Sequence, residues 1–209
     1  MIDTPQIQAF AGQAMIPQPA LVTGVVLCGG QGRRMGGQDK GWLLYQGRPL
    51  VSYALRALSG VADQVLINAN RNLPAYAALG YPVFCDEETG YLGPLAGLLA
   101  ALRQATTPWV LTLPCDMPCF GENELVRLCS AWQPGQSAIC TVEDGIRLHP
   151  VIALVDRELA DSLAGYLSAG GRKVETWFRE QQLTRVDFSD RPGVLRNLNT
   201  PDDWSAERC

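Results

Sequence analysis

A glycine-rich segment that directly follows the first apolar run constrains the fold of this chain most strongly. Residues 22–27 form a short β-branched run, which is typical of a strand buried on both faces, as in a parallel sheet. Five glycines follow within residues 29–37. Glycine permits positive φ, so successive backbone N–H groups can point into one concavity that binds an anion. With the charges of Arg33, Arg34 and Lys40, the segment predicts a loop that binds a triphosphate; a glycine-rich turn with solvated basic side chains is the alternative.

Two well-known phosphate-binding loops do not match this segment. A P-loop requires a lysine that follows glycine and precedes serine or threonine, whereas Lys40 lies between Asp39 and Gly41. The dinucleotide pattern G-x-G-x-x-G would start at Gly30, but its last position is Met35. The loop therefore indicates a different nucleotide-binding fold.

Strand-like apolar runs alternate with helix-like stretches along the first half of the chain. Further strands are expected at residues 64–68, 82–85 and 109–113. Helices are expected at residues 49–58, 73–79 and 94–105. This alternation predicts an α/β, Rossmann-like fold with three α/β/α layers around a mostly parallel sheet.

The second half of the chain is less regular. Residues 137–142 and 150–154 flank a hairpin-like turn at 143–145, which predicts a mixed sheet there. Later helices are expected at residues 157–167 and 173–181, and in a C-terminal segment that Thr200 can cap and Pro201 can open. We interpret residues 21–209 as a single domain and residues 1–20 as a loose extension.

Composition excludes several classes of protein. The formal net charge is −4 with acids and bases mixed along the chain, so no basic stripe typical of nucleic-acid binders is present. The start of the chain resembles neither a signal peptide nor a membrane span. Seven cysteines without a C-x-x-C pair indicate reduced thiols and a cytoplasmic protein. Because His149 is the only histidine, chemistry must depend on carboxylates, cations and backbone amides.

Two polar residues follow strand-like runs where ligands bind in open α/β sheets. Asp116 comes after the run 109–113, at the expected carboxyl end of a central strand. One carboxylate suits Mg²⁺, which commonly takes one or two carboxylates together with phosphate oxygens and water. Asn68 ends another run, and its amide can offer a donor and an acceptor to a purine. A helix cap is the alternative for Asp116, and an ordinary strand end for Asn68.

The glycine-rich segment resembles a family signature. It reads L-C-G-G-Q-G-R-R-M-G-G-Q-D-K, and the molybdenum cofactor guanylyltransferases have L-A-G-G-x-x-R-R-M-G-G-x-D-K. The one departure is Cys28, where alanine is usual and a small side chain is kept. The resemblance covers about residues 22–204 and continues through the segments 68–71, 93–97, 114–116, 149–150, 186–190 and 197–201.

The resemblance implies a Mg²⁺-dependent enzyme that transfers GMP from GTP to molybdopterin or Mo-molybdopterin, with cofactor-insertion partners or apo-molybdoenzymes downstream. It implies catalytic roles for Lys40, Arg34 and Asp116, with Asp116 as the metal ligand. Residues implied to contact the nucleotide are Leu27, Cys28, Gly29, Gly30, Lys40, Asn68, Asp86 and Asp116.

Other polar residues have weaker assignments. By resemblance, Asn199 and its neighbours Asp187, Asp190 and Asn197 border the pterin side or a second metal-phosphate side, although loop and cap roles explain them nearly as well. Arg172 and Lys173 either meet the molybdopterin phosphate or are solvated. We interpret His149 as structural.

Three alternatives remain open at this point. A molybdopterin cytidylyltransferase would share the phosphate machinery, and a noncatalytic molybdenum cofactor carrier would keep a degenerate nucleotide pocket. A sugar-phosphate nucleotidyltransferase is more distant, since those enzymes resemble L-A-G-G-x-G-T-R-L.

Overall fold

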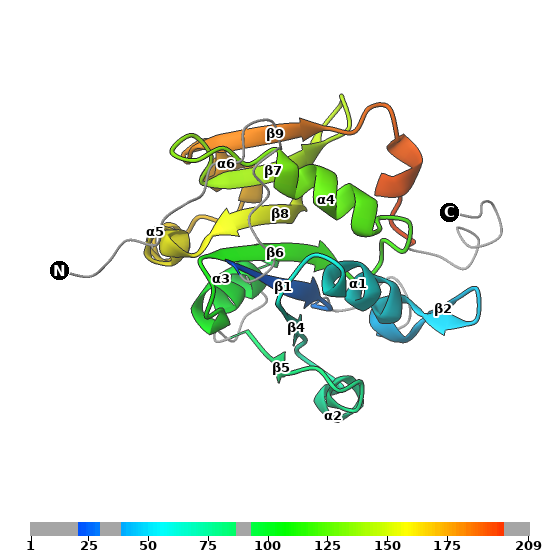
Figure 1. Ribbon diagram of the computed structural model, residues 1–209. Coiled ribbons are helices and arrows are strands. Elements are labelled where there is room, and N and C mark those ends of the chain that lie inside the picture. Colours follow the sequence, from blue (N-terminus) through cyan, green and yellow to red (C-terminus); the bar gives the residue numbers. More distant parts are fainter. Residues whose placement is uncertain (1–20, 30–38, 87–92, 199–209) are drawn as a thin grey trace.

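The computed structural model describes residues 21–29, 39–86 and 93–198. These residues form one seven-stranded sheet and a separate two-stranded hairpin (Figure 1). The sheet has the order β5-β4-β1-β6-β8-β7-β9. Its strands are β1 (Val22–Leu27), β4 (Gln64–Asn68), β5 (Val83–Phe84), β6 (Trp109–Pro114), β7 (Ile139–Glu143), β8 (Leu148–Asp156) and β9 (Leu183–Asp187). The hairpin pairs β2 (Leu44–Tyr45) with β3 (Arg48–Pro49).

The sheet is parallel in its first half and mixed in its second. β1 pairs in parallel with β4 and with β6, and β4 pairs in parallel with β5. β8 is antiparallel to both of its neighbours, β6 and β7, while β9 is parallel to β7. The predicted α/β class, the mostly parallel first half and the mixed second half are therefore confirmed.

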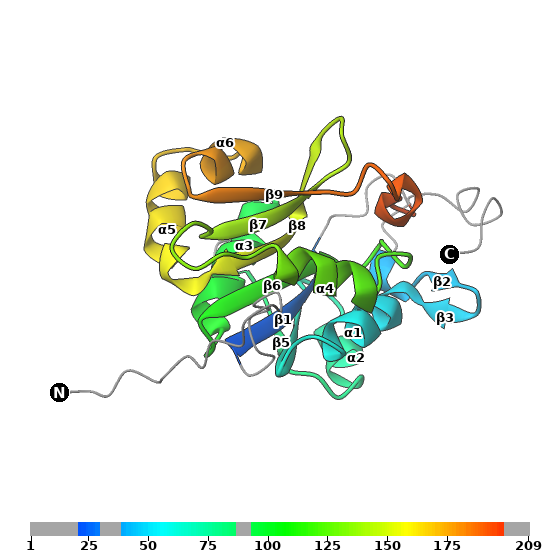
Figure 2. The ribbon, with the colours of Figure 1, turned by 45° about the horizontal axis from the view of Figure 1, so that its top comes forward.

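Helices cover both faces of the sheet (Figure 2). The α-helices are α1 (Leu50–Ser59), α2 (Leu73–Ala77), α3 (Pro94–Gln104), α4 (Glu122–Ser130), α5 (Ala160–Ser168) and α6 (Val174–Arg179). The described residues also contain the 3-10 turns η3 (Lys40–Trp42), η4 (Arg157–Leu159) and η5 (Pro192–Leu195). One apolar core joins α1 and α4 to the sheet, and a second joins α3, α5 and α6 to the opposite face.

Strand β1 lies in the interior of the sheet, between β4 and β6, and is buried on both faces. Val26 belongs to the core beside α1, whereas Val25 belongs to the core beside α3, so both faces of the strand are buried. Gly24 lets α1 pack closely, because an added Cβ would lie 3.2 Å from the Leu58 side chain. The central strands thereby present their carboxyl ends at a rigid edge.

The sequence did not predict the hairpin β2–β3, helix α4 or strand β9. The hairpin β2–β3 is only two residues long on each side, and α4 begins directly after Gly121, close to Pro118. β9 is an edge strand with one largely exposed face, so its apolar signal is weak. The predicted extension 1–20 and the helix expected from Thr200 lie outside the described residues.

Two expectations drawn from composition can be compared with the described residues. None of the helices described is long and apolar enough to cross a bilayer. Five cysteines are free thiols: Cys28, Cys85, Cys115, Cys129 and Cys140. Cys119 is disulfide-bonded, so the expectation of fully reduced thiols is wrong at that position.

Candidate active site

A pocket of about 410 Å³ opens at the carboxyl ends of β1, β4 and β6. In a parallel sheet this edge collects the loops that follow neighbouring strands, so residues far apart in the sequence meet there. Every predicted nucleotide contact that falls within the described residues lines this pocket: Leu27, Cys28, Gly29, Lys40, Asn68, Asp86 and Asp116. Gly30 and Arg34, which complete the predicted set, lie outside the described residues.

A lysine–aspartate pair occupies the β6 side of the pocket. Asp116 follows β6 and is 8% exposed, and its backbone oxygen accepts a hydrogen bond from Leu198 N at 2.9 Å. Lys40 begins the turn η3, and its Nζ donates to Asp116 Oδ2 at 3.0 Å. The Lys40 side chain keeps 32% of its surface exposed. The pair therefore combines a fixed carboxylate with a cation that an entering anion can reach.

A second carboxylate is held by amides on the β5 side. Asp86 Oδ1 accepts from Asn68 Nδ2 at 3.0 Å, and Asp86 Oδ2 accepts from Asn70 Nδ2 at 2.8 Å. The backbone N–H of Asp86 also donates to Asn70 Oδ1 at 2.9 Å. Both carboxylate oxygens are thus oriented by uncharged donors, and each oxygen retains a second lone pair.

A glycine in α3 makes room for this amide network. An added Cβ at Gly97 would lie 2.8 Å from Asn68 Oδ1, which is shorter than real Cβ contacts. Asn68 itself is 1% exposed, so its amide has little freedom to move away. Gly97 therefore permits the close approach of the first turns of α3 to the end of β4.

Two thiols line the floor of the pocket. Cys28 and Cys115 follow the adjacent strands β1 and β6, and both are buried. A hydrogen bond with Cys28, together with burial, raises the pKa of the Cys115 thiol well above its usual range. The Cys115 sulfur thus keeps its proton, and Cys28 keeps the small side chain expected at its position.

Several weaker candidates lie away from the pocket lining. His149 is 8% exposed, and its Nε2 lies 2.8 Å from Asp144 Oδ2. Hydrogen bonds from this imidazole and from backbone N–H groups of the hairpin hold the pKa of Asp144 below its usual range. Arg172 Nη1 donates to Leu167 O at 2.8 Å, next to the end of α5.

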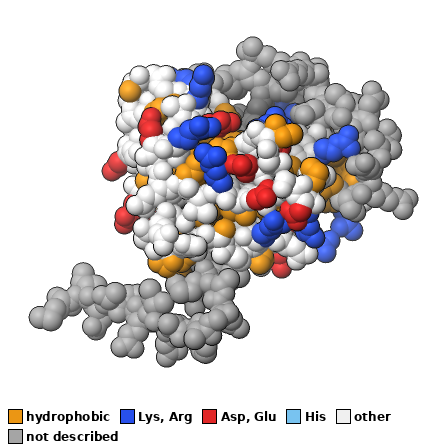
Figure 3. All heavy atoms as spheres, turned by 90° about the horizontal axis from the view of Figure 1, so that it is seen from above, with side chains coloured by type: hydrophobic (Ala, Val, Ile, Leu, Met, Phe, Trp, Pro, Cys, Tyr) orange, Lys and Arg blue, Asp and Glu red, His pale blue; other side chains and the backbone are white. Residues whose placement is uncertain are grey.

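The predicted polar set near residue 190 is likewise separate from the pocket. Asp187 accepts from Ser189 N at 2.8 Å, and Asp190 pairs with Arg127 at 3.0 Å. Asn197 is exposed, and Asn199 lies outside the described residues. Seen from the β9 edge of the sheet, acidic and basic side chains are interspersed on this face (Figure 3).

Sequence reasoning assigned no role to two polar residues of the pocket. Asn70 and Arg71 follow β4 directly and line the cavity. Their position just beyond a predicted strand was the available signal, because the carboxyl ends of parallel strands share one edge. Arg71 adds positive charge to a pocket that also contains Lys40.

Comparison with known proteins gives a consistent result. Residues 24–186 match the MobA-like NTP transferase domain. The molybdenum cofactor guanylyltransferase of Shewanella frigidimarina (strain NCIMB 400) is 40% identical over 188 residues, which cover 90% of this chain and 94% of that protein. The protein of the same name from Shewanella sediminis (strain HAW-EB3) is 39% identical over 181 residues, covering 87% and 92%.

A solved structure supports the fold. The crystal structure of molybdopterin-guanine dinucleotide biosynthesis protein A from Archaeoglobus fulgidus superposes with a TM-score of 0.68 and 23% identity. The match covers 87% of this chain and 94% of that chain. From the domain match and the two relatives in Shewanella, the chain belongs to the molybdenum cofactor guanylyltransferase family of MobA-like NTP transferases.

Proposed function

We propose that this chain transfers GMP from GTP to the terminal phosphate of molybdopterin, with or without bound molybdenum. An oxygen of that terminal phosphate attacks the α-phosphorus and forms a new P–O bond. The bond from the α-phosphorus to the oxygen bridging to the β-phosphate breaks, and its electron pair leaves with pyrophosphate. Because the nucleophile is already an anion, no protein base is required. The chain supplies alignment and charge neutralisation.

One observation carries the proposal: an oriented carboxylate and a lysine–aspartate pair line the same pocket. Asp86 follows β5 and Asp116 follows β6, which are three strand spacings apart in the sheet order. At the usual spacing this is about 14 Å. An extended nucleoside triphosphate spans a comparable length, so its base can lie at Asp86 while its phosphates lie at Lys40.

The Asp86 end favours guanine over the other bases. A carboxylate only accepts hydrogen bonds, and guanine presents two adjacent donors, N1–H and the 2-amino group. Cytosine and adenine place a ring-nitrogen acceptor next to their amino group, which a carboxylate would repel. The amides of Asn68 and Asn70 keep the Asp86 oxygens in place to accept from these two guanine donors.

The Lys40 end suits the α-phosphate. An ammonium has three N–H donors, so Lys40 can bind a phosphate oxygen while it still contacts Asp116. Gly29 lines the start of the same loop, and an added Cβ there would meet only the Asn68 and Asn70 side chains, at 3.7 and 3.8 Å. Arg34 and the amide of Gly30 remain predicted contributors to this end.

We also propose that the enzyme depends on Mg²⁺, with Asp116 as its protein ligand. The described residues contain no group of three or more His, Cys, Asp or Glu side chains arranged to hold a metal. A lone, largely buried carboxylate beside a phosphate site still fits Mg²⁺, which takes its remaining ligands from phosphate oxygens and water. Bound there, Mg²⁺ would supply charge neutralisation for the triphosphate.

A product assay tests the function and separates it from its rivals. Each of the four nucleoside triphosphates is incubated with purified molybdopterin and Mg²⁺, and both pyrophosphate and the dinucleotide product are measured. We expect release with GTP and little with CTP, and no release without the pterin. Preference for CTP would identify a cytidylyltransferase. Tight pterin binding with no pyrophosphate would identify a carrier.

The proposal includes a cellular setting. GTP and the pterin acceptor are intracellular metabolites, so we place the reaction in the cytoplasm. The product would then pass to an insertion partner or directly to an apo-molybdoenzyme.

A further inference from the structure

A buried carboxylate lies directly before the lysine of the pocket and takes no part in the steps above. Asp39 is 8% exposed, and its Oδ1 accepts from the Tyr76 hydroxyl at 2.7 Å and from Gly41 N at 3.3 Å. Its Oδ2 accepts from Asn72 Nδ2 at 2.9 Å and lies 3.8 Å from Arg71 Nε. These donors compensate for the loss of water around the charge.

The direction in which Asp39 points matters for its neighbour. A carboxylate beside a triphosphate would repel it, and would compete with Asp116 for the ammonium of Lys40. The three donors hold Asp39 toward the interior instead, and the guanidinium of Arg71 offsets its charge. Lys40 is left paired with Asp116 at 3.0 Å.

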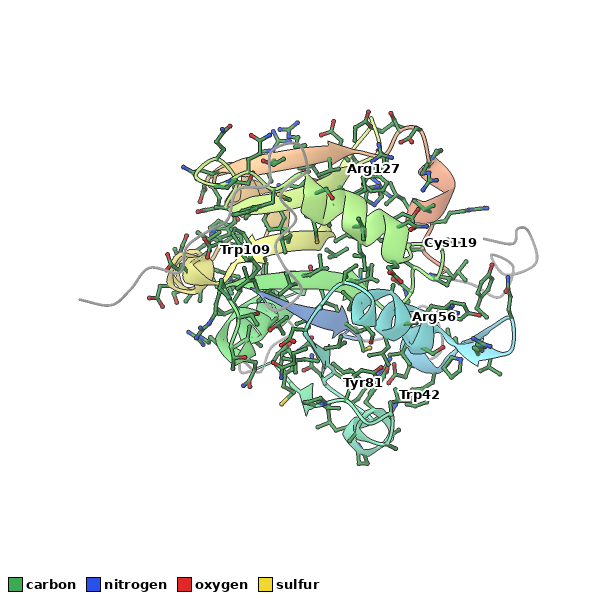
Figure 4. All side chains as sticks on the ribbon, viewed as in Figure 1. Trp42, Arg56, Tyr81, Trp109, Cys119 and Arg127 are labelled. Carbon is green, nitrogen blue, oxygen red and sulfur yellow. The ribbon has the colours of Figure 1, made fainter. Side chains whose placement is uncertain are left out.

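Tyr76 is the best-fixed of these donors. It belongs to α2 and is 0% exposed, and its ring packs against Trp42 with 5.3 Å between ring centroids. Trp42 is labelled in Figure 4. Burial, the nearby Cys28 and the hydrogen bond to Asp39 all raise the pKa of Tyr76. The hydroxyl therefore keeps its proton and remains a donor to Asp39.

The backbone connects Asp39 to the position of Lys40. Asp39 caps η3, with its side chain bonded to Gly41 N and its carbonyl accepting from Trp42 N at 3.1 Å. The approach of α2 is close, because an added Cβ at Gly41 would overlap the Tyr76 hydroxyl. Any shift of the Asp39 carboxylate would therefore move the turn from which Lys40 projects.

We infer that Asp39 and Tyr76 are positioning residues for Lys40: their buried hydrogen bond fixes η3, and so holds the ammonium at Asp116 in register for the α-phosphate. The part that concerns the phosphate rests on the proposed function. We call the hydrogen-bonded pair of Asp39 and Tyr76 the clamp. Asn72 donates to Asp39 and so links the clamp to Asp86, because Asn70, two residues earlier, donates to Asp86.

Lysine acylation tests the clamp without any need for activity. The chain has two lysines, and the exposed Lys173 is an internal control for Lys40. Native protein is treated briefly with an acetylating ester, and the ratio of Lys40 to Lys173 acetylation is read by peptide mass spectrometry. Tyr76→Phe removes the hydroxyl but keeps the ring. We expect it to raise the ratio roughly threefold to tenfold, the range that the net free energy of one hydrogen bond gives.

The matched control is Tyr53→Phe. It removes a hydrogen bond of equal length, 2.7 Å from the Tyr53 hydroxyl to Tyr45 O, which involves no atom of Asp39 or of α2. We expect the ratio to stay at its wild-type value in this variant. An unchanged ratio in Tyr76→Phe, or an equal rise in both variants, overturns the inference.

A kinetic cycle separates positioning from general stability. Pyrophosphate release is measured for wild type, Tyr76→Phe, Lys40→Ala and the double variant. We expect Tyr76→Phe to lower kcat roughly tenfold with little change in the KM for GTP, and to cause no further loss in the Lys40→Ala background. Losses that multiply in the double variant would show that Tyr76 does not act through Lys40.

A rescue experiment gives an independent check. Gly41→Ala should lower kcat, because its new methyl group displaces Tyr76, and Tyr76→Phe should restore part of that activity by removing the overlapping oxygen. Failure of rescue would contradict the close packing on which the clamp depends. If wild type releases no pyrophosphate from GTP and molybdopterin, the proposed function fails, and the acylation ratio still decides whether the clamp exists.

Discussion

Lys40 Nζ and Asp116 Oδ2 lie 3.0 Å apart, although 76 residues separate them in the sequence. The contact exists because Lys40 follows β1, Asp116 follows β6, and these strands are parallel neighbours. Sheet topology thus brings the segments that carry this cation and this carboxylate to one edge of the sheet.

The lysine–aspartate pair is expected to be essential for turnover. Asp116→Ala and Lys40→Ala should each lower kcat for pyrophosphate release by on the order of 100-fold or more, while the thermal melting temperature changes little. Asp190→Ala is the control, since it removes an exposed ion pair of the same 3.0 Å length outside the pocket. An Asp116→Ala enzyme with full activity and an unchanged Mg²⁺ requirement would refute the metal assignment.

Asp86 is expected to select the base. Asp86→Asn replaces one acceptor oxygen by a donor, which would oppose the N–H groups of guanine. The measurement is the ratio of kcat/KM for GTP to that for ITP, which lacks the 2-amino group. We expect the ratio to fall by roughly tenfold in Asp86→Asn, the cost of about one misplaced hydrogen bond to a charged group. Equal ratios in both enzymes would exclude a contact between Asp86 and the guanine edge.

Two glycines in helices should respond oppositely to alanine. Gly97→Ala should raise the KM for GTP several-fold, because its Cβ would lie 2.8 Å from Asn68 Oδ1. Gly165, in α5, has no atom within 4 Å of an added Cβ, so Gly165→Ala should raise stability by up to about 1 kcal/mol without affecting activity. The two measurements are GTP titration and thermal unfolding. An unaltered KM in Gly97→Ala would show that GTP binding does not depend on the position of the Asn68 amide.

How much of the site could be predicted depended on where each residue sits in the strand pattern. Asn68, Asp86 and Asp116 follow apolar runs that are easy to detect, and the parallel arrangement brings such positions together. The glycine-rich segment was recognised from its composition, and its phosphate-binding role stays a prediction because residues 30–38 lie outside the described residues. The strands of the first half were predicted nearly to the residue for the same reason, since both faces of β1 and β6 are buried.

The clamp behind Lys40 could not be predicted in this way. Tyr76 lies in a helix of five residues, and nothing local indicates that its hydroxyl reaches a carboxylate 37 positions earlier. Asn72 adopts φ 52°, a left-handed conformation that depends on the tertiary setting. β9 was missed because an edge strand with one exposed face has little apolar periodicity.

Buried thiols predict how stability changes in alkali. Burial raises the pKa of Cys129 to about 12 and that of Cys140 to about 11. A thiol whose pKa is higher in the folded protein than its unfolded value near 8.5 stabilises the folded state, and this contribution is fully present below pH 8.5. It is lost as the pH rises toward the pKa that the thiol has in the folded state. Between pH 8 and pH 10 we expect a loss on the order of 1 kcal/mol per thiol, measured by urea unfolding.

Cysteine variants test whether the two buried thiols cause this loss of stability. The loss between pH 8 and pH 10 should shrink in Cys129→Ala and Cys140→Ala, and should persist in Cys85→Ala, whose side chain is exposed. Alkylation at pH 8 should modify Cys85 faster than either buried thiol. Rapid native-state alkylation of Cys129 would contradict its burial.

The most direct measurement is a crystal structure of the wild-type chain with GTP and Mg²⁺. The guanine edge is expected at Asp86, with the triphosphate between Gly29 and Lys40 and the metal bound to Asp116. A nucleotide bound at another surface, with these four residues untouched, would contradict the site and the reaction proposed for it.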